Sequence, residues 1–351
     1  MQLRSAYAAR DWNRWRSSPG KDGRAAHAFF ALGLLLILLP SFVACGTERV
    51  EAVPDSFVRI SIDKPDPDRL LRSYFGGYVS PRPADPFDAG LLHERSGRLY
   101  VDMDVLSRNQ PAAAEHLTDI DADGSIGWDE FESFIAESYN AVRGAPPSLE
   151  ELVRETSFDP ADADWMRVDV HGVMTTARRR IYVRESAIRS ALEEYADRNG
   201  RLIYPIGTVF FGEHYLDDAR VETTVMRKRP DGFWDYFVYD EDGLPARGTA
   251  TPPRELSVPV QCVGCHYGDK VFEPEASFPA RARPGPHGPR QLYVEDAYRD
   301  VEVVRYFDEH RRRSDTVLGL YGTLFVSKLR AERNAGGLDE ADADLLDALE
   351  L

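Results

Sequence analysis

Three residues whose chemistry points to a covalent cofactor stand close together, at Cys262, Cys265 and His266. They form a Cys-x-x-Cys-His run, the spacing typical of c-type haem attachment. The two thiols would form thioethers with the haem vinyl groups, and the adjacent imidazole would be the proximal iron ligand. Half of a zinc knuckle and a redox dithiol are the alternatives. Zinc needs four ligands and no second cysteine pair is present, so the run predicts one covalent haem c.

A second run, residues 119–130, has oxygen ligands at the spacing of an EF-hand calcium loop. Gly124 at position six allows the sharp turn, and Glu130 at position twelve would bind the ion through both carboxylate oxygens. The predicted calcium ligands are Asp119, Asp121, Asp123, Ser125 (through its carbonyl) and Glu130. The alternative is an acidic turn that binds nothing. In an exported protein we expect a structural role, with a Kd on the order of 10⁻⁴ M or weaker.

EF-hands normally pair, and the sequence has no second acidic loop of this kind. A degenerate partner around Arg95–Asp104 is one possibility, and the absence of a partner is the other. Both leave one predicted calcium site.

The first 44 residues have the pattern of a secretion signal. A basic region precedes the apolar run at residues 28–39, and small residues follow it. The end, Phe42-Val43-Ala44-Cys45-Gly46, resembles a bacterial lipoprotein box in which Cys45 carries the lipid. An uncleaved membrane anchor is the alternative. We expect an exported lipoprotein that faces the periplasm from the outer membrane. Every cysteine then has a role, and no pair remains for a disulfide.

The charge of the chain limits its partners. The formal net charge is −16, with 59 acidic against 43 basic residues. Nucleic acid is excluded as a partner because phosphate binding requires concentrated Lys and Arg. An acidic body suits calcium and small cationic substrates.

The hydrophobic patterns predict an α+β protein: a small antiparallel sheet with one packed helix, after an EF-hand segment and before further helices. The predicted regions are a linker at 45–95, the EF-hand segment at 96–145, the haem domain at 160–278, and a linker with a helical extension at 279–351. We expect strands at Phe57–Ile62, Arg179–Val183, Ile206–Phe211, Arg220–Lys228 and Phe233–Tyr239. We expect helices at Trp128–Val142, Glu185–Arg198, Tyr293–Arg312, Asp315–Asn334 and Asp339–Leu349. The turn at Arg229-Pro230-Asp231-Gly232 should join the last two strands as a hairpin.

The haem domain resembles a known family over about 100 of the 351 residues. The matching pieces are Arg-Arg-Ile-Tyr-Val at 179–183, Tyr-Pro-Ile-Gly-Thr-Val-Phe at 204–210, Val-Glu-Thr-Thr-Val-Met at 221–226, Gly-Phe-Trp-Asp-Tyr-Phe at 232–237, the haem run, and Asp-Lys-Val-Phe at 269–272. Their order and spacing are similar to those of the cytochrome P-460 and cytochrome c′-beta family of mono-haem proteins. The resemblance implies a β-rich fold around one haem.

The resemblance also implies roles for single residues. Arg179 and Glu222 match the polar residues on the open side of the family's haem, where Glu222 would be a catalytic base and Arg179 would orient the substrate. A surface ion pair of the two is the alternative. The lysine that is joined to the haem in the P-460 branch corresponds to Gly212, so we expect no such bond here; Lys228 is a poor substitute because it ends a strand.

These observations favour a five-coordinate haem protein that binds nitric oxide, or oxidises hydroxylamine and passes electrons to a redox partner. The first alternative is a six-coordinate electron carrier whose sixth iron ligand is Met174, His214 or, less favourably, Met226. The second is a calcium-stabilised sensor or scaffold on the membrane surface.

Overall fold

The computed structural model describes residues 53–64, 67–171, 177–198, 202–251, 257–266, 291–293 and 319–351. For Val170, His171, Arg198, Gly264–His266, Gln291–Tyr293, Gly319 and Leu320 only the backbone is described. The predicted signal region with Cys45 and the candidate ligand Met174 lie outside these ranges, as does most of the predicted helix at Tyr293–Arg312. Within the described part of the chain, helices of a length and apolarity sufficient to span a membrane are absent.

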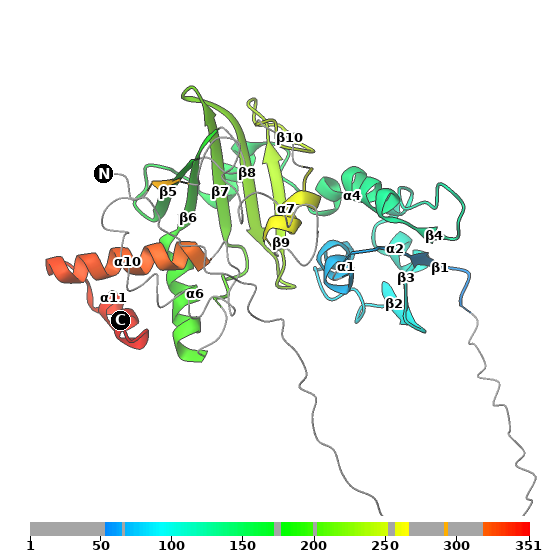
Figure 1. Ribbon diagram of the computed structural model, residues 1–351, viewed down its shortest axis with the longest axis horizontal. Coiled ribbons are helices and arrows are strands. Elements are labelled where there is room, and N and C mark those ends of the chain that lie inside the picture. Colours follow the sequence, from blue (N-terminus) through cyan, green and yellow to red (C-terminus); the bar gives the residue numbers. More distant parts are fainter. Residues whose placement is uncertain are drawn as a thin grey trace, which may run out of the picture. The chain divides into compact units, whose positions relative to one another are not determined.

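The fold is α+β and has two sheets, as Figure 1 shows. In the described ranges the smaller sheet has four strands in the order β2-β3-β1-β4. They are β1 (Phe57–Ile60), β2 (Leu92–Arg95), β3 (Arg98–Asp102) and β4 (Ser125–Ile126). The helices around them are α1 (Pro67–Phe75), the short η1 (Gly76–Tyr78), α2 (Met103–Asn109), α3 (Pro111–Ala114), α4 (Trp128–Val142) and α5 (Leu149–Thr156).

The region predicted as a linker at 45–95 contains more regular structure than its Pro- and Asp-rich sequence suggests. Helix α1 starts at Pro67, a residue that fits the first turn of a helix because that turn needs no bond from its N–H. It buries Leu70, Leu71, Tyr74 and Phe75 completely or almost completely. Phe75 packs on Phe131 and Phe134 of α4, with ring centroids 5.6 and 5.7 Å away. This apolar face makes the region part of the core rather than a linker.

The possible partner loop at Arg95–Asp104 is a different structure. Arg98–Asp102 forms β3, which pairs with β2 and with β1. The strand of the calcium loop, β4, pairs in parallel with β1, where Ile60 lies opposite Ile126. Strand β1 therefore takes the place beside β4 that a second EF-hand loop would occupy.

In the described ranges the larger sheet has seven antiparallel strands in the order β10-β9-β8-β7-β6-β5-β11. They are β5 (Trp165–His171), β6 (Arg178–Arg184), β7 (Val209–Leu216), β8 (Ala219–Lys228), β9 (Trp234–Tyr239), β10 (Pro245–Ala246) and β11 (Gln291–Tyr293). Strands β8 and β9 form the predicted hairpin through the turn at 229–232, in which Arg229 N donates to Phe233 O. Strand β7 begins three residues later than predicted, because Gly207 and Thr208 form a turn against Pro205 and Lys228.

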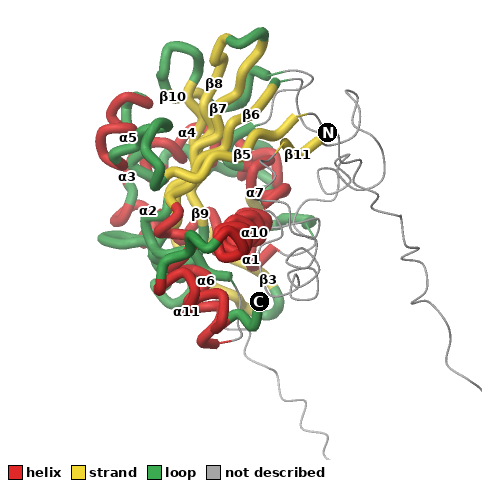
Figure 2. The backbone as a smooth tube through the Cα atoms, turned by 90° about the vertical axis from the view of Figure 1, so that its left-hand side faces the viewer, coloured by secondary structure: helices red, strands yellow, loops and turns green. Residues whose placement is uncertain are grey.

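Alternation along the strands separates two faces of this sheet. On one face Phe210 packs on Tyr321 of α10 (Gly319–Ala335), with centroids 5.0 Å apart. On the other face Phe237 contacts Tyr139 of α4 at 6.2 Å. Figure 2 shows α10 and α7 (Val260–His266) on one side of the sheet and α5 on the other. Helices α6 (Glu185–Arg198) and α11 (Glu340–Ala348) pack with α10.

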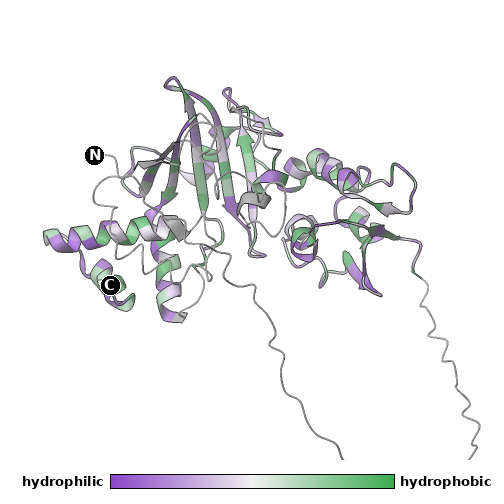
Figure 3. Ribbon diagram, viewed as in Figure 1, coloured by the Kyte–Doolittle hydropathy of each residue, from purple (hydrophilic) through white to green (hydrophobic). Residues whose placement is uncertain are grey.

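Helix periodicity explains these packing faces. In α4 the buried residues Phe131, Phe134, Ile135 and Tyr139 follow the three-to-four-residue spacing of one helix face. Figure 3 shows the corresponding alternation of hydrophobic and hydrophilic bands along α4 and α10. The predicted bounds of α4 and α6 agree with the structure because both helices carry such a stripe.

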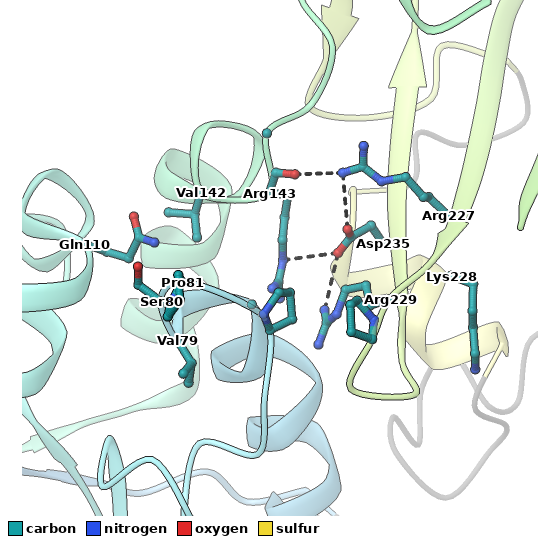
Figure 4. A pocket seen from close by; sticks show the side chains of 14 residues that line it. Val79, Ser80, Pro81, Gln110, Val142, Arg143, Arg227, Lys228, Arg229 and Asp235 are labelled. Atoms are coloured by element: carbon teal, nitrogen blue, oxygen red, sulfur yellow. Dashed lines mark hydrogen bonds and ion pairs between the residues drawn. The ribbon is translucent and has the colours of Figure 1, made fainter. Parts of the chain in front are cut away.

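A buried charge cluster fastens the end of α4 to the larger sheet (Figure 4). Asp235 on β9 has Arg143 Nε at 3.3 Å, Arg229 Nη1 at 3.3 Å and Arg227 Nη2 at 3.4 Å from its carboxylate. The Arg143 carbonyl accepts a further bond of 2.7 Å from Arg227. A Cβ at Gly77 would lie 0.7 Å from Arg143 Nη1, so only glycine fits there. A cavity of about 360 Å³ adjoins this charge cluster.

Candidate functional site

The predicted calcium loop, residues 119–130, brings its acidic residues together. One carboxylate oxygen from each of Asp119, Asp121 and Asp123 lies within 4.8 Å of the others. Gly124 has a φ of +84°, the left-handed conformation that favours glycine. Glu130 folds back over the loop and accepts bonds from Ile120 N at 2.5 Å and Gly127 N at 2.8 Å. This arrangement concentrates oxygen atoms, the ligands that Ca²⁺ prefers.

The carboxylates of this loop repel one another. A hydrogen bond from Asp123 N lowers the pKa of Asp121, but partial desolvation and the charges of Asp123 and Glu130 outweigh it, so the pKa is raised. A cation among these oxygens would remove that repulsion. Ser125 is buried, and its N–H and hydroxyl both donate to Asp123 at 2.8 Å.

The Cys-x-x-Cys-His run forms helix α7. Cys262, Cys265 and His266 all lie within this helix. Cys262 is partly buried. Val260 and Val263 are buried, which fixes the helix on the protein. The whole run that predicts haem c therefore lies on one helix.

Arg179, His214 and Glu222 lie side by side across three strands. Arg179 on β6 pairs with His214 on β7, and His214 pairs with Glu222 on β8. Directly opposed residues point to the same side of a sheet, so these three share one face. It is the face of Phe210, which packs on α10. We call Arg179, His214 and Glu222 the polar row.

Glu222 is the most strongly bonded member of the polar row and is 1 % exposed. Its Oε1 lies 2.9 Å from His214 Nδ1 and accepts a bond of 2.6 Å from the Thr251 hydroxyl. Its Oε2 accepts a bond of 2.5 Å from Ala250 N. Ala250 and Thr251 belong to the segment that precedes α7, so Glu222 fastens the approach to the Cys-x-x-Cys-His helix to the sheet.

The surroundings shift the ionisation of both groups. Burial alone would raise the pKa of Glu222, but hydrogen bonds from His214, Thr251 and Ala250 outweigh it, so the pKa is lowered. Burial lowers the pKa of His214, as does the charge of Arg179, against the opposing effect of Glu222. At neutral pH the row therefore holds a carboxylate beside a neutral imidazole.

These pKa shifts predict acid sensitivity. As the pH falls below about 6.5, the unfolded chain protonates its His214 imidazole before the folded protein does, so stability decreases. A further decrease follows below about 4.5, where Glu222 is protonated first in the unfolded chain. Between pH 7 and pH 5.5 the free energy of unfolding, measured with urea, should decrease less for His214→Gln than for the unsubstituted protein. Equal losses would contradict the buried neutral imidazole.

The other predicted site residues that the structure describes lie outside the polar row. Met226 lies on the same face as Phe210, its direct neighbour on β7, and is 9 % exposed. Lys228 donates to Gly232 O within the hairpin turn and lies 5.1 Å from the Trp234 ring. A Cβ at Gly212 would lie 2.6 Å from Thr224 Oγ1, so a larger residue there would displace that hydroxyl.

Sequence reasoning treated His214 only as a possible iron ligand and did not single out Thr251 or Ala250. The signal for His214 was its position two residues after Gly212 on the same strand, which places both on one face. The partners from the loop carry no such signal, because their contacts with Glu222 span 28 and 29 residues.

Comparison with known proteins gives no assignment: no protein-family model, curated protein or solved structure matches this chain.

Proposed function

We propose that this chain is an exported c-type mono-haem protein that binds or oxidises a small nitrogen species, nitric oxide or hydroxylamine, and that it also binds calcium. The observation that carries the proposal is the polar row together with its bonds to the segment before α7. Arginine, imidazole and carboxylate side chains on one face, tied to the approach to a Cys-x-x-Cys-His helix, are suited to hydrogen-bond a small polar ligand and to hold its proton.

Cys262 and Cys265 would hold the haem by thioether bonds, and His266 would bind its iron. When bound, the haem supplies an iron site for a small ligand and the capacity for one-electron transfer. The run forms one helix, α7, in which Val260 and Val263 are buried.

The residues of the polar row would act on the ligand directly. Arg179 would donate hydrogen bonds to an oxygen or nitrogen of the ligand and orient it. The paired His214 and Glu222 would hold or accept a proton. The Thr224 hydroxyl beside Gly212 occupies the place where the lysine of the P-460 branch would begin, which favours chemistry without that covalent bond.

An electron carrier with a six-coordinate iron is less well supported. His214 has Nδ1 2.9 Å from Glu222 and Nε2 3.3 Å from Thr224 Oγ1, so both ring nitrogens already have polar neighbours. Met226 packs within the sheet face. These contacts favour a role for His214 in the polar row over iron ligation.

The calcium loop would have a structural role. It leads directly into α4, whose last residues join the charge cluster around Asp235. A calcium-stabilised sensor or scaffold remains the second candidate, because this helix connects the ion site with the strands β8 and β9. The lipoprotein-type signal and Cys45 would fix the protein at the periplasmic side of the outer membrane.

Calcium should bind to residues 119–130 and raise the melting temperature. Glu130→Gln should weaken binding at least about tenfold, because it removes the bidentate ligand at position twelve. Asp129→Asn, at the non-ligand position eleven, is the matched control and should bind as the unsubstituted protein does. Isothermal titration calorimetry measures all three. Equal affinities for the two variants would contradict the assigned ligands.

The test of the proposed function is an absorption spectrum of the full exported protein before and after addition of nitric oxide and of hydroxylamine. The expected result is a five-coordinate haem whose spectrum changes with at least one of the two. A six-coordinate, low-spin ferric haem that neither compound affects would contradict the proposal and favour the electron carrier.

A further inference from the structure

His214 is the central member of the polar row, between Arg179 on β6 and Glu222 on β8, and its side chain contacts two residues of β8. Its Nδ1 lies 2.9 Å from Glu222 Oε1, and its Nε2 lies 3.3 Å from Thr224 Oγ1. We propose that His214 is the proton-accepting residue of this site and that Glu222 is a positioning residue that fixes the imidazole. The inference rests on the proposed function for the source of the proton, and it assigns the base to a different residue from the one that the family resemblance implies.

Glu222 is poorly suited to accept a proton. Its two oxygens already accept bonds from the Thr251 hydroxyl, from Ala250 N and from His214. Such bonds stabilise the ionised carboxylate, and protonation would break at least one of them in a side chain that is almost completely buried. The same bonds hold the carboxylate still, which is the property a positioning residue needs.

His214 has the arrangement of an imidazole base oriented by a carboxylate. When Nδ1 carries the proton and donates it to Glu222, the lone pair lies on Nε2. The ring is 6 % exposed, and burial together with the charge of Arg179 keeps it neutral. After proton uptake the imidazolium would lie beside the carboxylate, which stabilises its charge.

Thr224 and Gly212 define the path to Nε2. The Thr224 hydroxyl lies 3.3 Å from Nε2 and 3.2 Å from Gly212 O, and a Cβ at Gly212 would displace it. A proton from an O–H or N–H of the ligand would pass to Thr224 Oγ1 while the hydroxyl proton passes to His214 Nε2. One proton enters and one leaves the hydroxyl, and no electron moves in this step.

Among the described residues, the charged groups that face His214 come from the two neighbouring strands. Arg179 lies opposite on β6 and Glu222 lies opposite on β8, and the uncharged Thr251 lies 3.3 Å from Nδ1. The ionisation of His214 therefore responds to one positive and one negative neighbour. Removal of the Glu222 charge should lower the pH at which the imidazole titrates.

The experiment has two arms on the full exported protein. In the first, ¹⁵N-histidine NMR of the reduced, carbon monoxide-bound form, which is diamagnetic, reports the tautomer and titration of His214. We expect the Nδ1–H tautomer and titration below about pH 6.5. An Nε2–H tautomer, or titration above that pH, would overturn the inference whether or not a nitrogen ligand binds.

In the second arm, stopped-flow absorption follows the haem after addition of hydroxylamine from pH 5 to pH 8. His214→Gln should slow the spectral change about 100-fold and remove its dependence on pH. Glu222→Gln should retain a pH-dependent change with its midpoint at lower pH. His93→Gln is the matched control. His93 bonds to Gly90 O and is far from the polar row in the sequence, so this variant should behave as the unsubstituted protein does.

The reverse pattern would overturn the inference: loss of the change in Glu222→Gln with an unaltered pH profile in His214→Gln assigns the base to Glu222. If the haem responds to hydroxylamine neither in the unsubstituted protein nor in any variant, hydroxylamine oxidation is contradicted. The NMR arm by itself then decides the role of His214. The two failures are thus distinguishable.

Discussion

Replacing Glu222 with alanine should lower the free energy of unfolding by at least about 3 kcal/mol, because three buried donors lose their acceptor at once. These donors are His214 Nδ1–H, the Thr251 hydroxyl and Ala250 N–H. Each unsatisfied buried donor costs on the order of 1–3 kcal/mol. Urea unfolding measured by circular dichroism at pH 7 gives the value.

The matched control is Glu213→Ala, one strand away and on the opposite face of the sheet. Glu213 is only partly buried and accepts bonds from Tyr215, at 2.8 Å, and from Tyr182, so its removal should cost clearly less than the removal of Glu222. Equal losses for the two substitutions would contradict the buried network around Glu222.

Replacing Asp235 with alanine should destabilise the protein by about 3–5 kcal/mol, because three guanidinium groups lose the carboxylate they share. Arg143 and Arg229 are almost completely buried and cannot gain compensating water, whereas Arg227 is partly exposed. The loss should appear in urea unfolding and should persist at high salt, since buried charges are little screened.

An exposed ion pair between the same helix and the strand region provides the comparison. Glu137 on α4 accepts two bonds from Arg247, at 2.6 and 2.7 Å, and both side chains are largely exposed. Glu137→Gln should leave stability almost unchanged, because solvent screens such pairs. If Glu137→Gln destabilised the protein as much as the Asp235 substitution does, it would contradict the claim that the charge cluster is what attaches α4 to the sheet.

The elements that the sequence predicted well are those with strong local signals. Helices α4 and α6 have the predicted bounds, and the hairpin of β8 and β9 follows from the turn at residues 229–232. Helix α1 was missed because Pro and Asp around residues 63–68 are typical of loops, although Pro67 suits a first turn. Strand β5 was missed as well, although Met166, Val168 and Val170 alternate with Arg167 and Asp169, the pattern of a half-buried strand.

The candidate site was only partly predictable. The spacing of Cys262, Cys265 and His266, and that of the calcium loop, can be read directly from the sequence. The alignment of Arg179 with Glu222 depends on His214 between them, and therefore on a strand register that no local pattern fixes. The bonds from Ala250 and Thr251, and the cluster around Asp235, join residues far apart in the chain and emerge only from the fold.

The central claim is that a haem is attached at α7 on the face of the sheet that carries the polar row. Intact-mass spectrometry of the exported protein, with an alkaline pyridine spectrum of the same sample, tests it most directly. The claim predicts a mass increase of one haem, a c-type pyridine spectrum, and loss of both when Cys262 and Cys265 are replaced with alanine. A protein that matures in a cytochrome c-producing host without this added mass would contradict it.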